Sequence, residues 1–225
     1  MADEKSTGAA GHAELSQLDK LQKWYETNAR NANIALGATL AVLVLLIAYF
    51  SWYKPHRENL AQEAIFKAQY WFENDSIALA INDPVDGFLT VAGSYGSTKA
   101  GNLANYYAGL GYYQLGDYAN AEKYLDKFCT KHDEVLGALA IGILADAQME
   151  NGKQEEALKN YKKAANFSDN EASAPFLLFK AGLAYDYTGN KKEALEFFNK
   201  LKKDYPLSNE ASEADKYIAK AEAAL

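Results

Sequence analysis

Cys129, His132 and Asp133 form a short run of side chains that could do chemistry. A thiol three residues before an imidazole, with a carboxylate beside it, suits an activated thiolate or half of a zinc site. Half a site binds nothing firmly, because a structural zinc ion takes four ligands. We favour the other interpretation, in which a small apolar cysteine lies near a helix end beside a solvated histidine. His12 and His56 are too far away to complete a site, so we expect no metal.

Other patterns of catalytic residues are weak. The segment "GSYGSTKAG" from Gly93 lacks the Gly-Lys-Ser/Thr order of a phosphate-binding loop and joins two predicted helices. No serine, histidine and acid set has local support. We therefore expect no enzyme, with no catalytic residue, no cofactor and no small-molecule substrate.

The composition favours an all-α protein. Ala, Leu, Lys, Glu and Tyr are abundant, strand formers are few, and the 4 prolines stand at predicted element ends. The net charge of -7 is spread along the 225 residues without a basic cluster, so nucleic acid is not an expected partner. With a single cysteine the chain forms no internal disulfide, and its stability must come from packing.

The chain has one long uncharged stretch, residues 31–53. As a helix it would be about 35 Å long, against a hydrocarbon thickness of about 30 Å. The sequence therefore predicts a transmembrane helix at 31–53, the alternative being a buried core helix. The long segment before it and the bulky residues after it favour an uncleaved anchor over a signal peptide. Aromatic residues, which prefer the headgroup region, stand at both ends: Trp24, Tyr25, Tyr49, Trp52 and Tyr53.

The segment before the span, residues 1–30, has two parts. Its polar start predicts a mobile tail. Apolar residues then recur at three- and four-residue steps, which predicts a short amphipathic helix that lies on the bilayer, binds a partner or is a solvated lead-in turn. They are Leu15, Leu18, Leu21 and Tyr25. Positive charges near the span are tied, three on each side, so charge does not choose its orientation.

Three glycines repeat at a spacing typical of helical-repeat proteins. Gly116, Gly152 and Gly189 lie 36 and then 37 residues apart, and an alanine follows each of them five residues later. A large side chain stands four residues after each alanine, and a small residue stands seven before each glycine. These columns are Ala121, Ala157 and Ala194; Leu125, Tyr161 and Phe198; Gly109, Ala145 and Gly182.

Each column has a mechanical role in an antiparallel helix hairpin. A glycine just past a helix end takes positive φ without steric cost and lets the chain reverse. Small residues at the crossing let the two helices approach closely, and the large residue fills the space beside them. The sequence thus predicts an all-α solenoid of about three to four helix hairpins plus a C-terminal capping helix.

These columns resemble those of tetratricopeptide repeats (TPR). The last unit, "LLFKAGLAYDYTGNKKEALEFFNKLKKDYPLS", also has Tyr185 and Pro206 where the family has them, whereas the middle unit has Gln148 in place of the tyrosine. The resemblance covers residues 57–225. It implies a degenerate unit at 57–98 with helices at about 57–80 and 84–95, units at 102–134, 138–170 and 175–207, and a capping helix at 208–225.

By analogy with TPR proteins, the first helix of each unit faces the concave side of the stack. Aromatic and apolar side chains there would bind an extended or helical peptide, because they bury area with little loss of rotamer freedom. The alternative for any one of them is packing against the next unit or the C-terminal helix. No lysine of a carboxylate clamp stands among these positions. The expected groove residues are Leu103, Tyr106, Leu110, Tyr113, Leu139, Met149, Phe176, Phe179, Leu183 and Tyr187, with Asp146 and Asp186 among them.

An N-terminal anchor followed by a TPR array is similar to the layout of bacterial YfgM-type proteins, ancillary subunits of the Sec translocon that work with periplasmic chaperones. This resemblance implies an inner-membrane protein with a cytoplasmic N-terminus and a periplasmic repeat domain. It implies translocon subunits, a periplasmic chaperone or an exported client as protein partners. The predicted function is a membrane-anchored adaptor, and the alternative is a self-associating scaffold for outer-membrane or cell-wall assembly.

Overall fold

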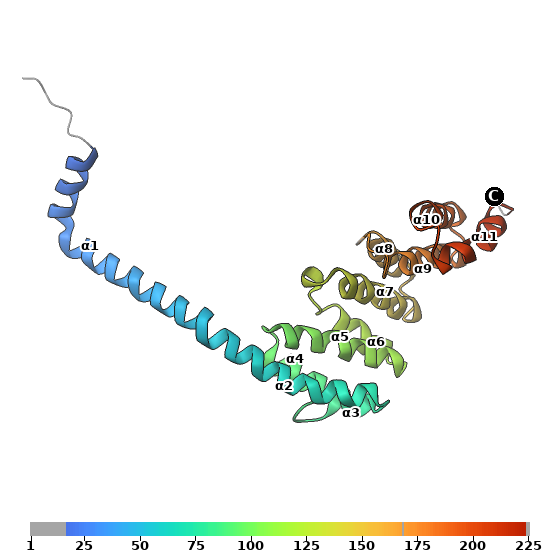
Figure 1. Cartoon of the computed structure of the whole chain (residues 1–225), viewed down its shortest axis with the longest axis horizontal. Coiled ribbons are helices and arrows are strands. Elements are labelled where there is room, and N and C mark those ends of the chain that lie inside the picture. The colour runs from blue at the N-terminus through green and yellow to red at the C-terminus, as the bar shows by residue number, and fades with distance from the viewer. Residues whose placement is uncertain (1–16, 168, 224–225) are drawn as a thin grey trace, which may run out of the picture. The chain divides into compact units, whose positions relative to one another are not determined.

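The computed structural model describes residues 17–167 and 169–223, except for the side chain of His132. Every regular element in these residues is helical, which confirms the all-α class (Figure 1). The predicted tail, Leu15 and the last two residues of the predicted capping helix lie outside the described residues. The chain divides into two compact units, Met1–Pro55 and His56–Leu225.

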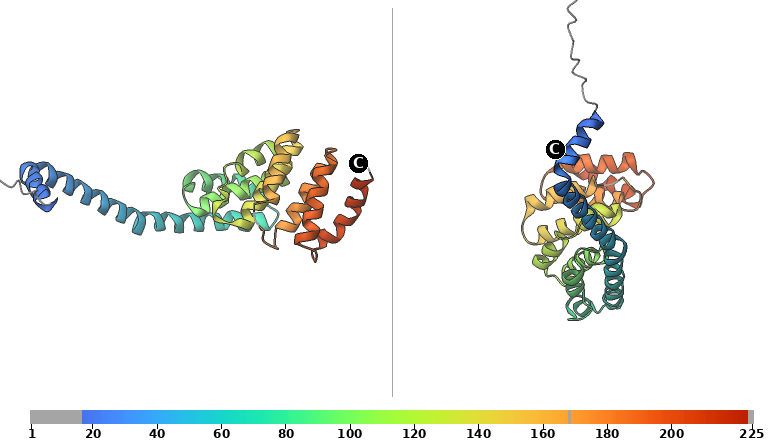
Figure 2. Two further views of the ribbon diagram at one scale, coloured as in Figure 1. Left: turned by 90° about the horizontal axis from the view of Figure 1, so that it is seen from above. Right: turned by 90° about the vertical axis from the view of Figure 1, so that its left-hand side faces the viewer.

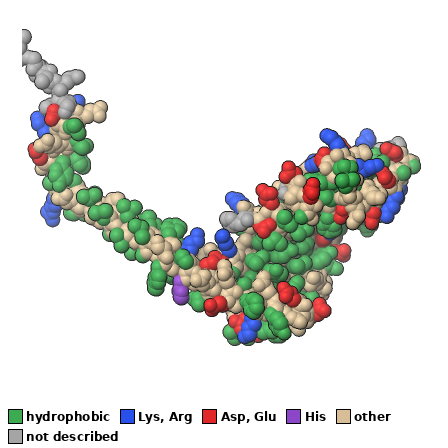
Figure 3. All heavy atoms as spheres, viewed as in Figure 1, with side chains coloured by type: hydrophobic (Ala, Val, Ile, Leu, Met, Phe, Trp, Pro, Cys, Tyr) green, Lys and Arg blue, Asp and Glu red, His purple; other side chains and the backbone are tan. Residues whose placement is uncertain are grey.

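The first unit is dominated by α1 (Gln17–Ala48), which continues through a π-helical turn, η1 (Tyr49–Tyr53). No described residue of α1 is buried within the molecule. The helical run Gln17–Glu73 contains the one stretch of the described chain that is long and apolar enough to cross a membrane. Figure 3 shows hydrophobic side chains along the middle of α1, with charged side chains before and after them. The predicted span has the required length and composition, and its insertion into a membrane stays a prediction.

The second unit is a stack of helices (Figure 2). Short loops and the turn η2 (Thr130–His132) connect them. In chain order they are α2 (Lys54–Glu73, which starts just before the unit), α3 (Ile77–Asn82), α4 (Phe88–Tyr95), α5 (Lys99–Gln114), α6 (Tyr118–Leu125), α7 (Glu134–Glu150), α8 (Gln154–Ala165), α9 (Ala174–Tyr187), α10 (Lys191–Asp204) and α11 (Asn209–Glu222).

The repeated glycines are the turns between paired helices. Gly116, Gly152 and Gly189 have φ angles of 76°, 75° and 84°, in the left-handed region that a side chain would disfavour. The backbone N–H after each glycine donates to a carbonyl at the helix end, as from Asp117 to Tyr112 at 2.9 Å. This is the Schellman arrangement, and it confirms the predicted turns.

The small residues lie where the two helices of a hairpin cross. A Cβ added to Gly109 would lie 2.5 Å from the Leu125 side chain, and one added to Gly182 would lie 2.4 Å from the Phe198 ring. Ala145 and Tyr161 share the corresponding buried cluster in the middle hairpin. The predicted pairing of a small residue with a large one is therefore confirmed.

The first hairpin differs from the sequence prediction of helices at 57–80 and 84–95. α2 ends at Glu73, because Asn74, Asp75 and Ser76 form a turn in which Asp75 has a φ of 55°. Ile77–Asn82 is a separate short helix. α4 begins at Phe88, because the Asp83 carboxylate accepts hydrogen bonds from the N–H groups that follow it and holds residues 83–86 in a turn.

The last described helix, α11, packs on α9 and α10. The Ser208 hydroxyl accepts a hydrogen bond from the Ala211 N–H at 3.0 Å and so caps its first turn. The face of α11 that packs on the last hairpin carries Ala211 and Ala214.

Candidate functional site

The hairpins α5–α6, α7–α8 and α9–α10 stack so that their first helices touch. α5 contacts α7, α7 contacts α9, and α9 contacts α11. Each second helix contacts the helix that follows it: α6 contacts α7, α8 contacts α9, and α10 contacts α11. Among the described residues, the second helices do not contact one another. The stack therefore curves toward the first helices. We call the face that α5, α7 and α9 present on this side the inner surface.

The inner surface carries a shallow pocket of about 220 Å³ between α7 and α9. It is lined by Met149, Tyr161, Lys180, Leu183, Ala184 and Tyr187. Tyr187 is 83% exposed and Phe176, on the same helix, is 43% exposed. Large aromatic side chains that are left uncovered beside a pocket are typical of protein-binding surfaces.

Charged and polar groups beside the pocket are satisfied within the chain. Asp146 on α7 is buried, forms an ion pair with Lys180 on α9, and accepts a hydrogen bond of 2.6 Å from the Tyr161 hydroxyl. Burial and then the Asp146 charge raise the pKa of Tyr161, so its hydroxyl stays protonated and donates. The Lys180 ammonium group also lies 5.4 Å from the centre of the Phe176 ring.

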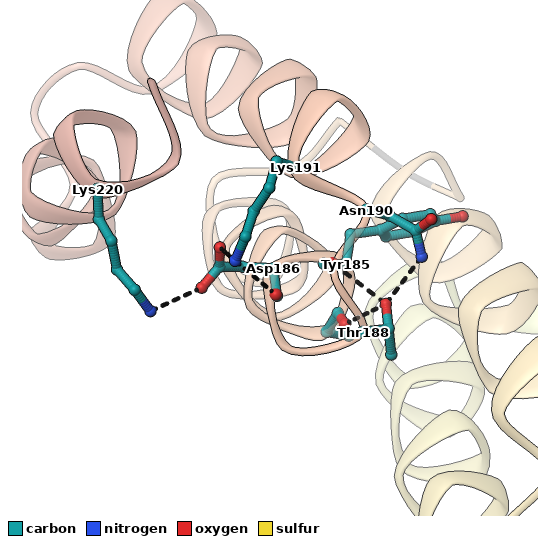
Figure 4. A network of polar contacts seen from close by, with 7 residues as sticks. Tyr185, Asp186, Thr188, Asn190, Lys191 and Lys220 are labelled. Atoms are coloured by element: carbon teal, nitrogen blue, oxygen red, sulfur yellow. Dashed lines mark hydrogen bonds and ion pairs between the residues drawn. The ribbon is translucent and has the colours of Figure 1, made fainter. Parts of the chain in front are cut away.

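A second polar cluster joins α9 to α10 and α11. Asp186 lies between Lys191 and Lys220, with nitrogen to oxygen distances of 2.5 and 3.2 Å (Figure 4). Hydrogen bonding to Lys191 is the main cause of the lowered pKa of the Asp186 carboxyl group. Because both lysines pair with Asp186, this cluster ties α9, α10 and α11 together and is not an open binding site.

Five of the expected groove residues lie at the inner surface around the pocket. Met149, Leu183 and Tyr187 line it, and Phe176 adjoins it through Lys180. Tyr113 lies near Asp146, whose charge adds to burial in raising the pKa of the tyrosine. Leu139 is partly exposed on α7. Whether a partner binds these residues stays a prediction.

Four expected groove residues instead pack within the stack. Tyr106 is only 7% exposed and lies against Phe128 and α7. Leu103 and Leu110 pack against the same cluster. Phe179 contacts Phe198 and Tyr217, with ring centres 5.9 and 5.6 Å apart. Tyr106 and Phe179 occupy equivalent positions, ten residues before the turn glycine. Both side chains pack against neighbouring helices of the stack, Tyr106 against α7 and Phe179 against α10 and α11.

Lys180 is a pocket residue that the sequence reasoning missed. It shares one helical stripe with Phe176, Leu183 and Tyr187, at steps of four, three and four residues, and that spacing could have found it. The Lys180 amine forms an ion pair with Asp146. The pocket therefore contains a lysine, but this lysine already has a carboxylate partner within the chain.

The Cys129 region has a structural role in the described chain. Cys129 is exposed, and its backbone N–H and carbonyl are both bonded by the Asn102 side chain, at 2.7 and 3.1 Å. The Asp133 carboxylate accepts from the Leu136 N–H and caps α7. The His132 side chain lies outside what the structure describes. No group of possible metal ligands is found among the described residues.

Comparison with known proteins supports the same fold. A family model described as the TT21 fifth ARM repeats domain matches residues 108–215. Crystal structures of the TPR-like repeats of a Podosopora anserina protein of kinesin light chain type are similar to this chain. Each of the two crystal structures aligns with this chain at a TM-score of 0.57, and the sequence identities are 16% and 15%. Each alignment covers 74% of this chain and 86% of the chain in the crystal structure. The chain carries a TPR-like repeat fold.

The crystal structure of the MamA protein aligns with a TM-score of 0.49 and 19% identity, over 74% of this chain and 91% of that one. No curated protein matches the sequence. Helical-repeat folds of this kind typically act as scaffolds that bind proteins and not as enzymes.

Proposed function

We propose that this chain is a membrane-anchored adaptor that binds a protein partner on its inner surface. The observation that carries the proposal is the stripe on α9 where Tyr187, which lines the pocket, and Phe176, which lies beside the pocket residue Lys180, both stay exposed. Exposing large aromatic rings to water is costly unless a partner covers them. A TPR-like scaffold supports the same function.

The pocket suits an apolar side chain of an extended or helical segment. Met149 and Leu183 supply its apolar wall, and Asp146 and Lys180 neutralise each other beside it. A charged peptide group would have to break that ion pair, which costs free energy when one partner is left buried. We therefore expect a partner segment with large apolar residues at helical or strand spacing.

The anchor is the second part of the proposal. In it, residues 31–53 cross a membrane and keep the repeat domain near that surface, where a weak contact can be well occupied because the effective concentration is high. By resemblance to YfgM-type proteins, the membrane would be the bacterial inner membrane, the repeat domain would be periplasmic, and the partner would be a translocon subunit, a chaperone or an exported client.

The test is photo-crosslinking in the native membrane. A photoreactive phenylalanine analogue placed at Tyr187 should crosslink one discrete partner, and the same analogue at Tyr70, exposed on α2, should not. Replacing Phe176 with Ala should then reduce the crosslink from position 187 about tenfold or more. Equal crosslinking from positions 187 and 70 would contradict binding at the inner surface.

One observation favours a second candidate, a self-associating scaffold. Phe66 and Tyr70 on α2 are 71% and 59% exposed, and four residues apart they share one face of that helix. Pairing of two copies through this face would bury both rings. A scaffold predicts that the purified full chain in detergent is an oligomer and that Phe66→Ser with Tyr70→Ser makes it monomeric by light scattering. An adaptor predicts a monomer in both cases.

A further inference from the structure

The first eleven described residues of α1, residues 17–27, have two different faces. At about 100° per residue, Leu18, Leu21, Trp24 and Tyr25 fall within a sector of about 120°. These four side chains are between 47% and 78% exposed. The charged side chains fall on the remaining face; they are Asp19, Lys20, Lys23 and Glu26.

The structure adds that this segment is a helix of its own. Asn28 has non-helical backbone angles, with φ −118° and ψ 17°, and α1 changes direction there (Figure 1). The Thr27 hydroxyl and the Asn28 amide donate to the carbonyls of Lys23 and Trp24 at 2.8 and 2.9 Å. Side chains thus satisfy carbonyl groups at the end of the first helix, so the break is stabilised locally.

A further contact fixes the break. The Tyr25 hydroxyl lies 2.9 Å from the Asn33 side-chain oxygen, a hydrogen bond that spans residues on both sides of Asn28. Asn33 already belongs to the uncharged stretch that begins at residue 31. Residues 17–27 are therefore held next to the start of that stretch, with no room for a linker between them.

We propose that residues 17–27 form an interfacial helix that lies along the lipid surface, with the Leu18, Leu21, Trp24 and Tyr25 stripe in the bilayer. This inference rests on the proposed anchor. If residues 31–53 span the membrane, the break at Asn28 lies at headgroup level. A straight helix would carry its apolar stripe about 16 Å into the water, whereas a bent one lays the stripe on the acyl chains.

The chemistry of the segment fits this partner. Indole and phenol rings prefer the headgroup region, where the ring is apolar and its N–H or O–H group remains wet. Lys20 lies beside the stripe, so its long stem can cover lipid while its ammonium group reaches the phosphates. If residues 31–53 span the membrane, the lipid surface also lies next to residues 17–27 in every molecule of the protein.

Spin labelling of the full chain in lipid vesicles tests the inference. In a Cys129→Ser background, single cysteines replace Leu21 on the stripe, Lys23 on the charged face and Leu43 in the span, and each carries a nitroxide. Vesicles contain phosphatidylcholine and phosphatidylglycerol. We expect the label at 21 to collide more with oxygen and less with a water-soluble nickel chelate than the label at 23. Leu18→Cys and Asp19→Cys form a second pair with the same expected contrast, in case one variant folds poorly.

The outcomes separate this inference from the proposed anchor. If positions 21 and 23 are equally open to the nickel chelate while position 43 is in lipid, the interfacial helix is wrong and the anchor stands. If position 21 is shielded from both reagents, a protein surface covers the stripe, which also overturns the inference. If position 43 is open to the chelate, the proposed membrane anchor itself fails.

Discussion

At the scale of single residues, stability depends on small residues at the helix crossings, because a larger residue there would clash with the neighbouring helix. Gly182 is such a case at a helix crossing, because an added Cβ would lie 2.4 Å from the Phe198 ring, which is fully buried. We predict that Gly182→Leu lowers the free energy of unfolding by about 1–3 kcal/mol or more, since the crowded ring cannot move away. Chemical unfolding of the purified chain in detergent measures the change.

Gly93→Ala is the control for that prediction. Gly93 lies in α4, and an added Cβ would meet nothing within 4 Å. Because alanine favours a helix, this substitution should leave the protein unchanged or stabilise it by up to about 1 kcal/mol. Equal destabilisation by both variants would mean that the close crossing of α9 and α10 does not restrict the size of the side chain at position 182.

Asp186 gives the protein a dependence on acid. Its folded-state pKa is lowered from 3.8, mainly by the hydrogen bond to Lys191. A carboxyl group with a lowered pKa stabilises the fold above its unfolded pKa, and this contribution is lost as the pH falls through the folded value. We predict that Asp186→Asn costs about 1–2 kcal/mol at pH 7, a modest figure because Lys220 is largely solvated. The cost should shrink as the pH falls below 3.8 and should vanish once the pH is below the lowered pKa of the folded state.

The matched control is Asp215→Asn. Asp215 pairs with Lys202, and both side chains are far more exposed than Asp186. Exposed ion pairs contribute about 0–1 kcal/mol, so this variant should follow the wild type from pH 7 to pH 3 in equilibrium unfolding. A constant difference between Asp186→Asn and the wild type over that range would show that the charge on Asp186 is not responsible.

At the scale of helices, the start of α5 depends on α2. The Glu58 carboxylate accepts hydrogen bonds from the N–H groups of Lys99 and Ala100 at 2.8 and 3.0 Å, and Thr98 caps the Gly101 N–H. A carboxylate at a helix N-terminus also interacts favourably with the helix dipole. We predict that Glu58→Ala destabilises the repeat domain by about 1 kcal/mol and speeds amide hydrogen exchange in the first turn of α5.

Glu63→Ala on the same helix separates this cap from a general loss of negative charge. Glu63 is exposed and lines a shallow surface depression whose lining residues all belong to α2. We expect exchange at Lys99 and Ala100 to stay at the wild-type rate in this variant. Faster exchange in both variants would assign the effect to charge and not to the cap.

At the scale of the whole molecule, the proposed anchor determines where the repeat domain works. Lysine near the centre of a membrane-spanning helix costs about 2.5–3.5 kcal/mol. We predict that Leu40→Lys with Leu43→Lys moves the chain from the alkali-resistant membrane fraction into the supernatant. Leu207→Lys is the control, because Leu207 is 99% exposed in the loop before α11. Membrane retention of the double variant would contradict a span at residues 31–53.

The sequence by itself determined the hairpins. The residues that define each hairpin all belong to one helix pair: the turn glycine, the small residue before it and the large residue after the alanine. Their spacing along the chain therefore determines which side chains meet. Gly109 against Leu125 and Gly182 against Phe198 could therefore be predicted. The first hairpin was predicted less well, because the turn at Asn74–Ser76 competes with a helical pattern on both sides of it.

Only the tertiary structure decided which helix faces remain open. The rotation of each first helix about its axis follows from packing against the next hairpin, so spacing could not show that the column of Tyr106 and Phe179 is covered. The ion pair between Asp146 and Lys180 joins residues that are 34 positions apart, and the hydrogen bond from Lys99 at the start of α5 to Glu58 joins residues that are 41 positions apart. Such contacts depend on how complete hairpins fit together, because distant side chains meet only after the backbones between them are packed.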